Sequence, residues 1–122
     1  MTKQVKNYSS CPVEATIDLI KGKWKIVIMF KLKDEPKRFN QLTRLLPNIT
    51  QRMLTSQLRE LEESNLIHRE VYPEVPVKVV YSLTPLAVSM MPLMLSIKEW
   101  GKEYLTLQNN KCHQVMEALR QV

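Results

Sequence analysis

Residues 40–66, NQLTRLLPNITQRMLTSQLRELEESNL, have the pattern of two short helices joined by a turn. Asn40 is a good N-cap for the first helix, whose apolar residues are Leu42, Leu45 and Leu46. Thr50 is a good N-cap for the second, longer helix, which should end near residue 64 and carries the apolar stripe Leu54, Leu58 and Leu61. Because only residues 47–49 separate the two, the stretch predicts a helix-turn-helix pair.

The chain changes to a β pattern directly after this pair. Asn65 suits the left-handed position that follows a helix, and Leu66 would then pack back on Leu61. Apolar and polar residues alternate over 77–83, and the run 67–72 is a suitable partner strand. We therefore expect one β-hairpin here.

Two helices and a short strand are expected before residue 40. Pro12 fits the first position of a helix that opens at Cys11 and breaks at Gly22. A second helix over about 23–33 is apolar nearly all round, which predicts a central place in the core. Its lysines at 25, 31 and 33 should reach solvent at its margins, and residues 37–39 could form a very short strand.

After the hairpin, Thr84-Pro85 opens a long C-terminal helix with an expected kink at Pro92. Its apolar residues recur at alternating spacings of four and three, which is a heptad seam: Leu86, Met90, Leu93, Ile97, Trp100, Tyr104 and Leu107. A second apolar face can pack on the domain, so the seam is left for a partner helix and predicts a homodimer.

This order of elements predicts a mainly α fold with a small β-hairpin, that is, an α+β winged helix-turn-helix with N- and C-terminal dimerisation helices. With 122 residues, the chain has the length of one domain over 1–122, with a core over 11–101 and a partly helical tail over 108–122. A signal peptide is not evident at residues 1–7, which favours the cytoplasm. The uncharged run 79–97 is interrupted by prolines and serines and is not expected to span a membrane.

The charge is concentrated in one third of the chain. The formal net charge is +6, yet residues 21–59 contain ten basic and two acidic residues, a net +8 that leaves −2 for the rest. Such a segment favours an anionic partner, either nucleic acid such as double-stranded DNA or a membrane surface, and the charge alone does not choose between them. With only two glycines, the chain has neither a dinucleotide-binding fingerprint nor a P-loop.

In a helix-turn-helix, the N-terminal part of the second helix enters the major groove. The exposed residues expected to read bases there are Gln51, Arg52, Thr55, Ser56 and Arg59. The glutamates at 60, 62 and 63 come only afterwards, where the helix should leave the groove. Residues expected at the DNA backbone or in the wing are Lys23, Lys25, Lys37, Arg38, Asn40, Arg44, Thr50 and Lys78.

The residues also resemble the HxlR-type winged-helix regulators, which are MarR-like bacterial transcription factors. The resemblance runs from residue 11 to about 101 and is carried by CPVE at 11–14, GKWK at 22–25, RFNQL at 38–42, ML at 53–54, LRELE at 58–62 and VYPEVPVKVVYSLT at 71–84. Lys21, Asn48 and Ala87 depart from glycines common in the family. The resemblance implies a dimer on pseudo-palindromic operator DNA, and we expect a repressor rather than an activator.

Cys11 is a candidate redox residue, because the positive end of a helix dipole favours a reactive thiolate; the alternative is an ordinary small residue at a cap. Some HxlR-type proteins sense oxidants or electrophiles through the cysteine matching Cys11. Cys112 would be its resolving thiol if the two termini meet at a dimer interface.

Other functions have weaker support. The methionines at 90, 91 and 94 could line a pocket for a small-molecule effector, although core packing is the simpler interpretation. His68 and His113 are isolated, so we expect no metal site. We also expect no cofactor and no enzyme activity. The alternative to a DNA-binding regulator is a winged-helix module that binds a protein partner without reading DNA sequence.

Overall fold

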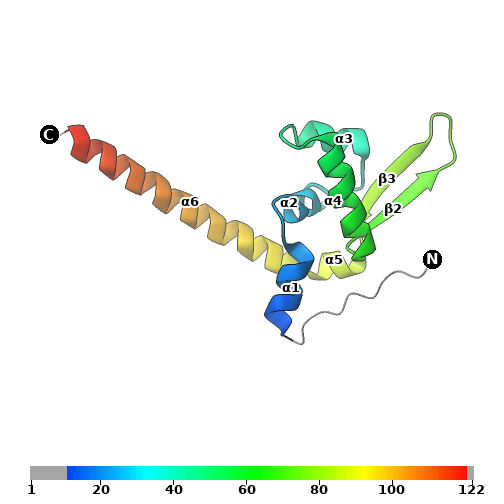
Figure 1. Ribbon diagram of the computed structural model, residues 1–122, viewed down its shortest axis with the longest axis horizontal. Helices are drawn as coiled ribbons and strands as arrows, with labels where there is room; N and C mark the ends of the chain where they lie inside the picture. Colours follow the sequence, from blue (N-terminus) through cyan, green and yellow to red (C-terminus); the bar gives the residue numbers. More distant parts are fainter. Residues whose placement is uncertain (1–10, 121–122) are drawn as a thin grey trace. The chain divides into compact units, whose positions relative to one another are not determined.

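The computed structural model describes residues 11–120, without the side chains of 112–118 and 120 (Figure 1). It contains, in chain order, α1 Pro12–Ile20, α2 Lys25–Lys31, β1 Lys37–Arg38, α3 Phe39–Leu45, α4 Gln51–Glu63, β2 Ile67–Tyr72, β3 Lys78–Leu83, α5 Pro85–Ser89 and α6 Met91–Arg120. The chain divides into two compact units, one ending at Ser89 and the other beginning at Met90. The first unit is a mixed α and β winged helix-turn-helix, which confirms the predicted fold class.

The sheet of the first unit has three antiparallel strands in the order β1-β3-β2. β2 and β3 form the predicted hairpin, with pairing from Ile67 opposite Leu83 to Tyr72 opposite Lys78. The short strand β1 joins the other edge of β3, where Lys37 pairs with Tyr81. The hairpin is therefore extended into a sheet by the strand that precedes α3.

Both ends of α4 have the caps that the sequence predicts. Thr50 Oγ1 accepts a hydrogen bond from the Met53 N–H at 3.1 Å. At the other end Asn65 has a φ of 59°, and the Leu66 N–H donates to the Leu61 carbonyl at 2.9 Å. This bond closes a Schellman motif, which fixes where β2 begins.

The start of α3 corrects one prediction, because Asn40 does not cap this helix. The N-cap residue is Arg38, whose backbone is extended and whose N–H donates to Gln41 Oε1 at 2.8 Å. Asn40 instead lies inside the first turn, where its carbonyl accepts from Thr43 Oγ1. The Gln41 side chain, inside the helix, accepts the hydrogen bond from the backbone N–H of the N-cap residue. The strand β1 therefore runs directly into α3.

The core of the first unit is built from apolar side chains of α2, α3, α4 and β2. Fully buried among them are Ile28, Met29, Leu42, Leu54, Leu58, Leu61, Leu66 and Ile67. Thr84 ties the end of α4 to the start of α5, because its Oγ1 donates to the Asn65 carbonyl at 2.7 Å and accepts from the Ala87 N–H at 3.1 Å. The central place predicted for α2 and the N-cap predicted at Thr84 are confirmed.

The C-terminal segment differs from the prediction of one kinked helix. α5 ends at Ser89 and α6 begins at Met91, so the chain breaks at Met90. Pro92 explains the break, because it has no N–H to donate to the carbonyl four residues earlier and is tolerated only in a first helical turn. Leu86 therefore lies on a different helix from the part of the seam that starts at Leu93, and Met90 lies on neither helix. None of the described helices combines the length and the apolar character needed to cross a bilayer.

Candidate nucleic-acid interface

The exposed face of α4 carries the five residues predicted to read bases. Together with Phe39 at the start of α3 they line one open surface hollow of about 550 Å³: Gln51, Arg52, Thr55, Ser56 and Arg59. The buried stripe Leu54, Leu58 and Leu61 holds the opposite side of the helix in the core. The amphipathic pattern of α4 is thus what places these polar side chains on one surface.

Two guanidinium groups of this face have no partner within the described part of the chain. Neither Arg52 nor Arg59 takes part in an ion pair or side-chain hydrogen bond within the described residues. The hydroxyl of Thr55 donates to the Gln51 carbonyl at 2.8 Å, which leaves its oxygen able to accept. The face therefore presents cationic donors and a hydroxyl acceptor to an outside ligand.

The residues expected at the DNA backbone lie in several different environments. Exposed are Lys23, Arg38, Asn40, Arg44 and Thr50. Lys37 is largely covered and pairs with Glu35 at 2.9 Å, and the Lys78 ammonium lies 5.2 Å from the centre of the Tyr72 ring. These two cations already have partners within the chain, whereas Arg38 and Arg44 remain exposed around α3.

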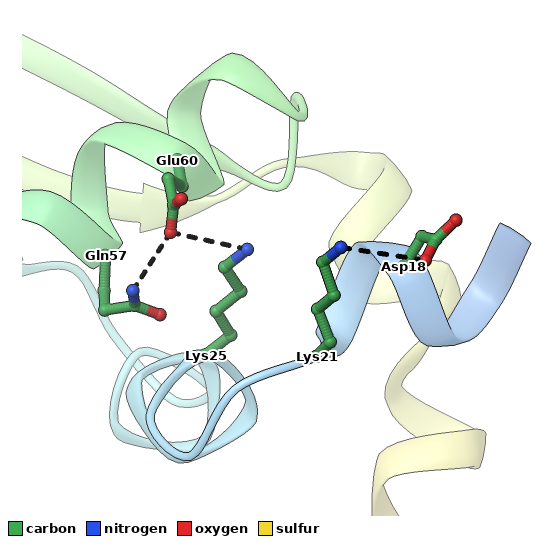
Figure 2. A network of polar contacts seen from close by, with 5 residues as sticks. All are labelled: Asp18, Lys21, Lys25, Gln57 and Glu60. Carbon is green, nitrogen blue, oxygen red and sulfur yellow. Dashed lines mark hydrogen bonds and ion pairs between the residues drawn. The ribbon is translucent and has the colours of Figure 1, made fainter. Parts of the chain in front are cut away.

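Lys25 corrects the prediction that it would reach solvent and a DNA phosphate. Its side chain is only 7% exposed, and its Nζ lies 3.5 Å from Glu60 Oε2 on α4 (Figure 2). Lys25 shares a helix face with the buried Ile28 and Met29, at spacings of three and four, so it must point into the fold. An ammonium placed there needs an anion, and Glu60 supplies it.

Gln57 completes this contact between α2 and α4. Its Nε2 donates to Glu60 Oε2 at 3.0 Å, so the carboxylate binds two donors from two helices (Figure 2). The buried Gln57 Oε1 has no hydrogen-bond partner among the described residues, and it lies 3.8 Å from the Cβ position at Gly22. Sequence reasoning missed this cluster, although the spacing of Lys25 from Ile28 and Met29 signals it.

The pKa of one hairpin residue, Tyr72, is raised. A hydrogen bond to the Glu70 carboxylate, together with its charge, raises the pKa of Tyr72 above the usual value of 10.0, and partial burial and Glu74 contribute less. The Tyr72 hydroxyl is the donor, so its proton is held by the carboxylate. At neutral pH the tyrosine ring is uncharged and lies under the Lys78 ammonium.

Cys11 is the N-cap residue of α1, as predicted, and its side chain is exposed. The side chain of Cys112 lies outside the described residues, so its proximity to Cys11 stays a prediction. The predicted seam on α6 is exposed in this chain, with stacked rings at Trp100 and Tyr104 whose centres are 5.5 Å apart. The effector pocket expected at Met90, Met91 and Met94 also stays a prediction.

Comparisons with known proteins agree on one family. A family model described as HxlR-like helix-turn-helix matches residues 19–109. The uncharacterized HTH-type transcriptional regulator YdeP of Bacillus subtilis is 53% identical over 98 residues, covering 80% of this chain and 77% of the relative. The HTH-type transcriptional regulator YodB of Bacillus subtilis is 33% identical over 105 residues, covering 85% and 94%.

Solved structures are similar over most of the chain. The redox regulator HypR in its reduced form superposes with a TM-score of 0.78 at 49% identity, covering 82% of this chain and 99% of that one. HypR in its oxidised form gives a TM-score of 0.72 at 54% identity, covering 76% and 96%. Residues 19–109, which the family model matches, include α4, the face described above and the hairpin.

Proposed function

The chain belongs to the HxlR-like helix-turn-helix family of transcriptional regulators, and from this premise we propose that it is a sequence-specific DNA-binding repressor. It acts as a homodimer on a pseudo-palindromic operator. The two α4 helices enter successive major grooves about 34 Å apart on one side of the duplex.

The observation that carries this proposal is the grouping of Gln51, Arg52, Thr55, Ser56 and Arg59 around one exposed hollow. Arginine donates two parallel hydrogen bonds to the O6 and N7 atoms of guanine, and a hydroxyl can bond to any base edge. The guanidinium groups of Arg52 and Arg59, which have no partner among the described residues, are suited to this role, and the exposed Arg38 and Arg44 are suited to phosphate contacts.

The dimer is supported by the exposed apolar side chains of α6. This helix has 30 residues, and the seam residues on it each have a relative exposure of at least 40%: Leu93, Ile97, Trp100, Tyr104 and Leu107. A seam of this period is typical of helices that pack against a second helix. Leu86 and Met90 precede α6 and lie outside this helix.

Cys11 is proposed as the regulatory thiol. Its exposure at a helix N-terminus supports this role, as does similarity to a redox regulator solved in reduced and oxidised forms. Hydrogen peroxide would convert the thiol to a sulfenic acid and release water. Peroxide should then abolish operator binding by the wild type and leave the Cys11→Ser variant active; equal behaviour of the two proteins would contradict the role.

The function is tested by selecting bound fragments from genomic DNA and measuring their affinity as a function of salt. A repressor should enrich an inverted repeat, and log K should fall steeply with log salt because bound counterions are released. Absence of duplex binding at low salt would contradict the proposal and favour the protein-interaction module.

A further inference from the structure

A second hollow of about 300 Å³ lies between α4 and the sheet. It is lined by Thr55, Leu58, Arg59, Glu62, Arg69 and Tyr81. Thr55 and Arg59 also line the hollow on the exposed face of α4, so the two hollows adjoin. The second hollow therefore begins where the proposed base-reading face ends.

The strand register explains why a second arginine, Arg69, lines this hollow. Arg69 on β2 is directly paired with Tyr81 on β3, and side chains of paired residues project from the same face of a sheet. From α4, Thr55, Arg59 and Glu62 lie at spacings of four and three, on one face of the helix. The hollow thus receives one guanidinium from the helix and one from the sheet.

The polar groups here suit an anion. Neither Arg59 nor Arg69 has an ion pair or side-chain hydrogen bond within the part of the chain that the structure describes. Two guanidinium forks against the single carboxylate of Glu62 leave a net positive charge. Tyr81 adds a hydroxyl donor, whereas the Thr55 hydroxyl is already bonded to the Gln51 carbonyl.

We propose that this hollow binds a backbone phosphate of the operator between Arg59 and Arg69, with Tyr81 as a further donor, which assigns Arg59 to the DNA backbone and leaves Arg52 as the arginine that reads a base. Guanidinium groups bind phosphate oxygens through paired hydrogen bonds. The site lies between the helix that enters the major groove and the hairpin, where the DNA strand has to pass from one to the other. This inference rests on the proposed DNA binding and adds Arg69 and Tyr81 to the residues that perform it.

The test measures duplex affinity against salt for wild type, Arg69→Gln and Arg69→Lys. Arg69→Gln should lose roughly tenfold in affinity, equally for operator and unrelated duplex, and the slope of log K against log salt should become shallower by about 0.9. Arg69→Lys should keep the slope, and Glu62→Gln should bind DNA more tightly. The matched control is Lys111→Gln, an exposed lysine of α6, which should change neither quantity.

A neutral methylphosphonate placed at single positions of the operator identifies the phosphate. One position should weaken the wild type and have no further effect on Arg69→Gln. An unchanged salt slope in Arg69→Gln would overturn the inference, while wild-type binding would still support the proposed function. If inorganic phosphate binds the wild type through Arg69 but, at constant ionic strength, does not weaken duplex binding, the site takes a free anion and not a phosphate of the DNA, which also overturns the inference.

Discussion

The ammonium of Lys25 and the carboxylate of Glu60, 3.5 Å apart, join the buried helix α2 to the helix proposed to read DNA. The two partners differ in their surroundings, since the Lys25 side chain is 7% exposed and that of Glu60 is 46% exposed. An unpaired charge costs far more inside the fold than at its surface. Removal of one partner should therefore lower the free energy of unfolding more than removal of the other, and this difference can be measured.

We expect Glu60→Leu to destabilise the protein more than Lys25→Met. Removing Glu60 leaves a buried ammonium unpaired, at a cost of about 2–3 kcal/mol, whereas removing Lys25 leaves a carboxylate that water reaches, at about 1 kcal/mol. Urea unfolding of both variants and of the double variant measures the difference. Equal losses in the two single variants would show that Lys25 gains solvent when its partner is removed.

Gly22 and Gly101 form a natural pair of test positions. Gly22 has a φ of 107°, a conformation that costs a residue with a Cβ roughly 1–2 kcal/mol, so Gly22→Ala should lower the melting temperature. A Cβ would lie 3.8 Å from Gln57 Oε1, an ordinary contact, so the backbone and not crowding causes the loss.

Gly101→Ala is the control, because Gly101 lies inside α6 and no atom of the described residues outside the helix backbone lies within 4 Å of its Cβ position. Alanine is a better helix former than glycine by roughly 1 kcal/mol, so this variant should unfold at a higher temperature. Melting temperatures that move in the same direction for both variants would contradict the conformation described at Gly22.

The raised pKa of Tyr72 predicts that the stability of the fold depends on pH. Its pKa is raised in the folded protein, chiefly by the hydrogen bond to Glu70, so the interaction stabilises the fold below pH 10. That stabilisation is lost as the pH rises through the folded-state pKa, because the tyrosinate is repelled by the carboxylate.

Glu70→Gln should bring the pKa of Tyr72 back toward 10.0, and Glu74→Gln should lower it less, because Glu74 is the weakest of the causes. Tyrosinate absorbance, with a Tyr72→Phe variant to isolate this residue from the other three tyrosines, measures both changes. A pKa of Tyr72 that is the same in wild type and Glu70→Gln would exclude the hydrogen bond.

Local signals explain which parts of the fold were predictable. Thr50, Asn65 and Thr84 each satisfy backbone groups within a few residues or at a helix end, so their roles follow from the sequence nearby. The hydrophobic stripe of α4 likewise places its polar face. The break at Met90 was harder, because a proline can either kink a helix or begin a new one.

The errors come from contacts between distant residues. Lys25 looks like one more surface cation until Glu60, 35 residues later, is placed beside it. Arg69 was not recognised as a candidate, because only the pairing with Tyr81 shows that it faces α4. Asn40 was expected to cap α3, yet Gln41 performs this function from inside the helix.

The central claim is that the exposed face of α4 reads DNA sequence, and Arg52→Ala tests it most directly. Against a selected operator and its single-base variants, Arg52→Ala should lose about 1–3 kcal/mol of discrimination at one base position, in both half-sites. Arg44→Ala, the matched control at a proposed phosphate contact, should weaken every duplex alike. If Arg52→Ala also weakens all duplexes equally and keeps the base preference of the wild type, Arg52 contacts only the DNA backbone and the claim is wrong.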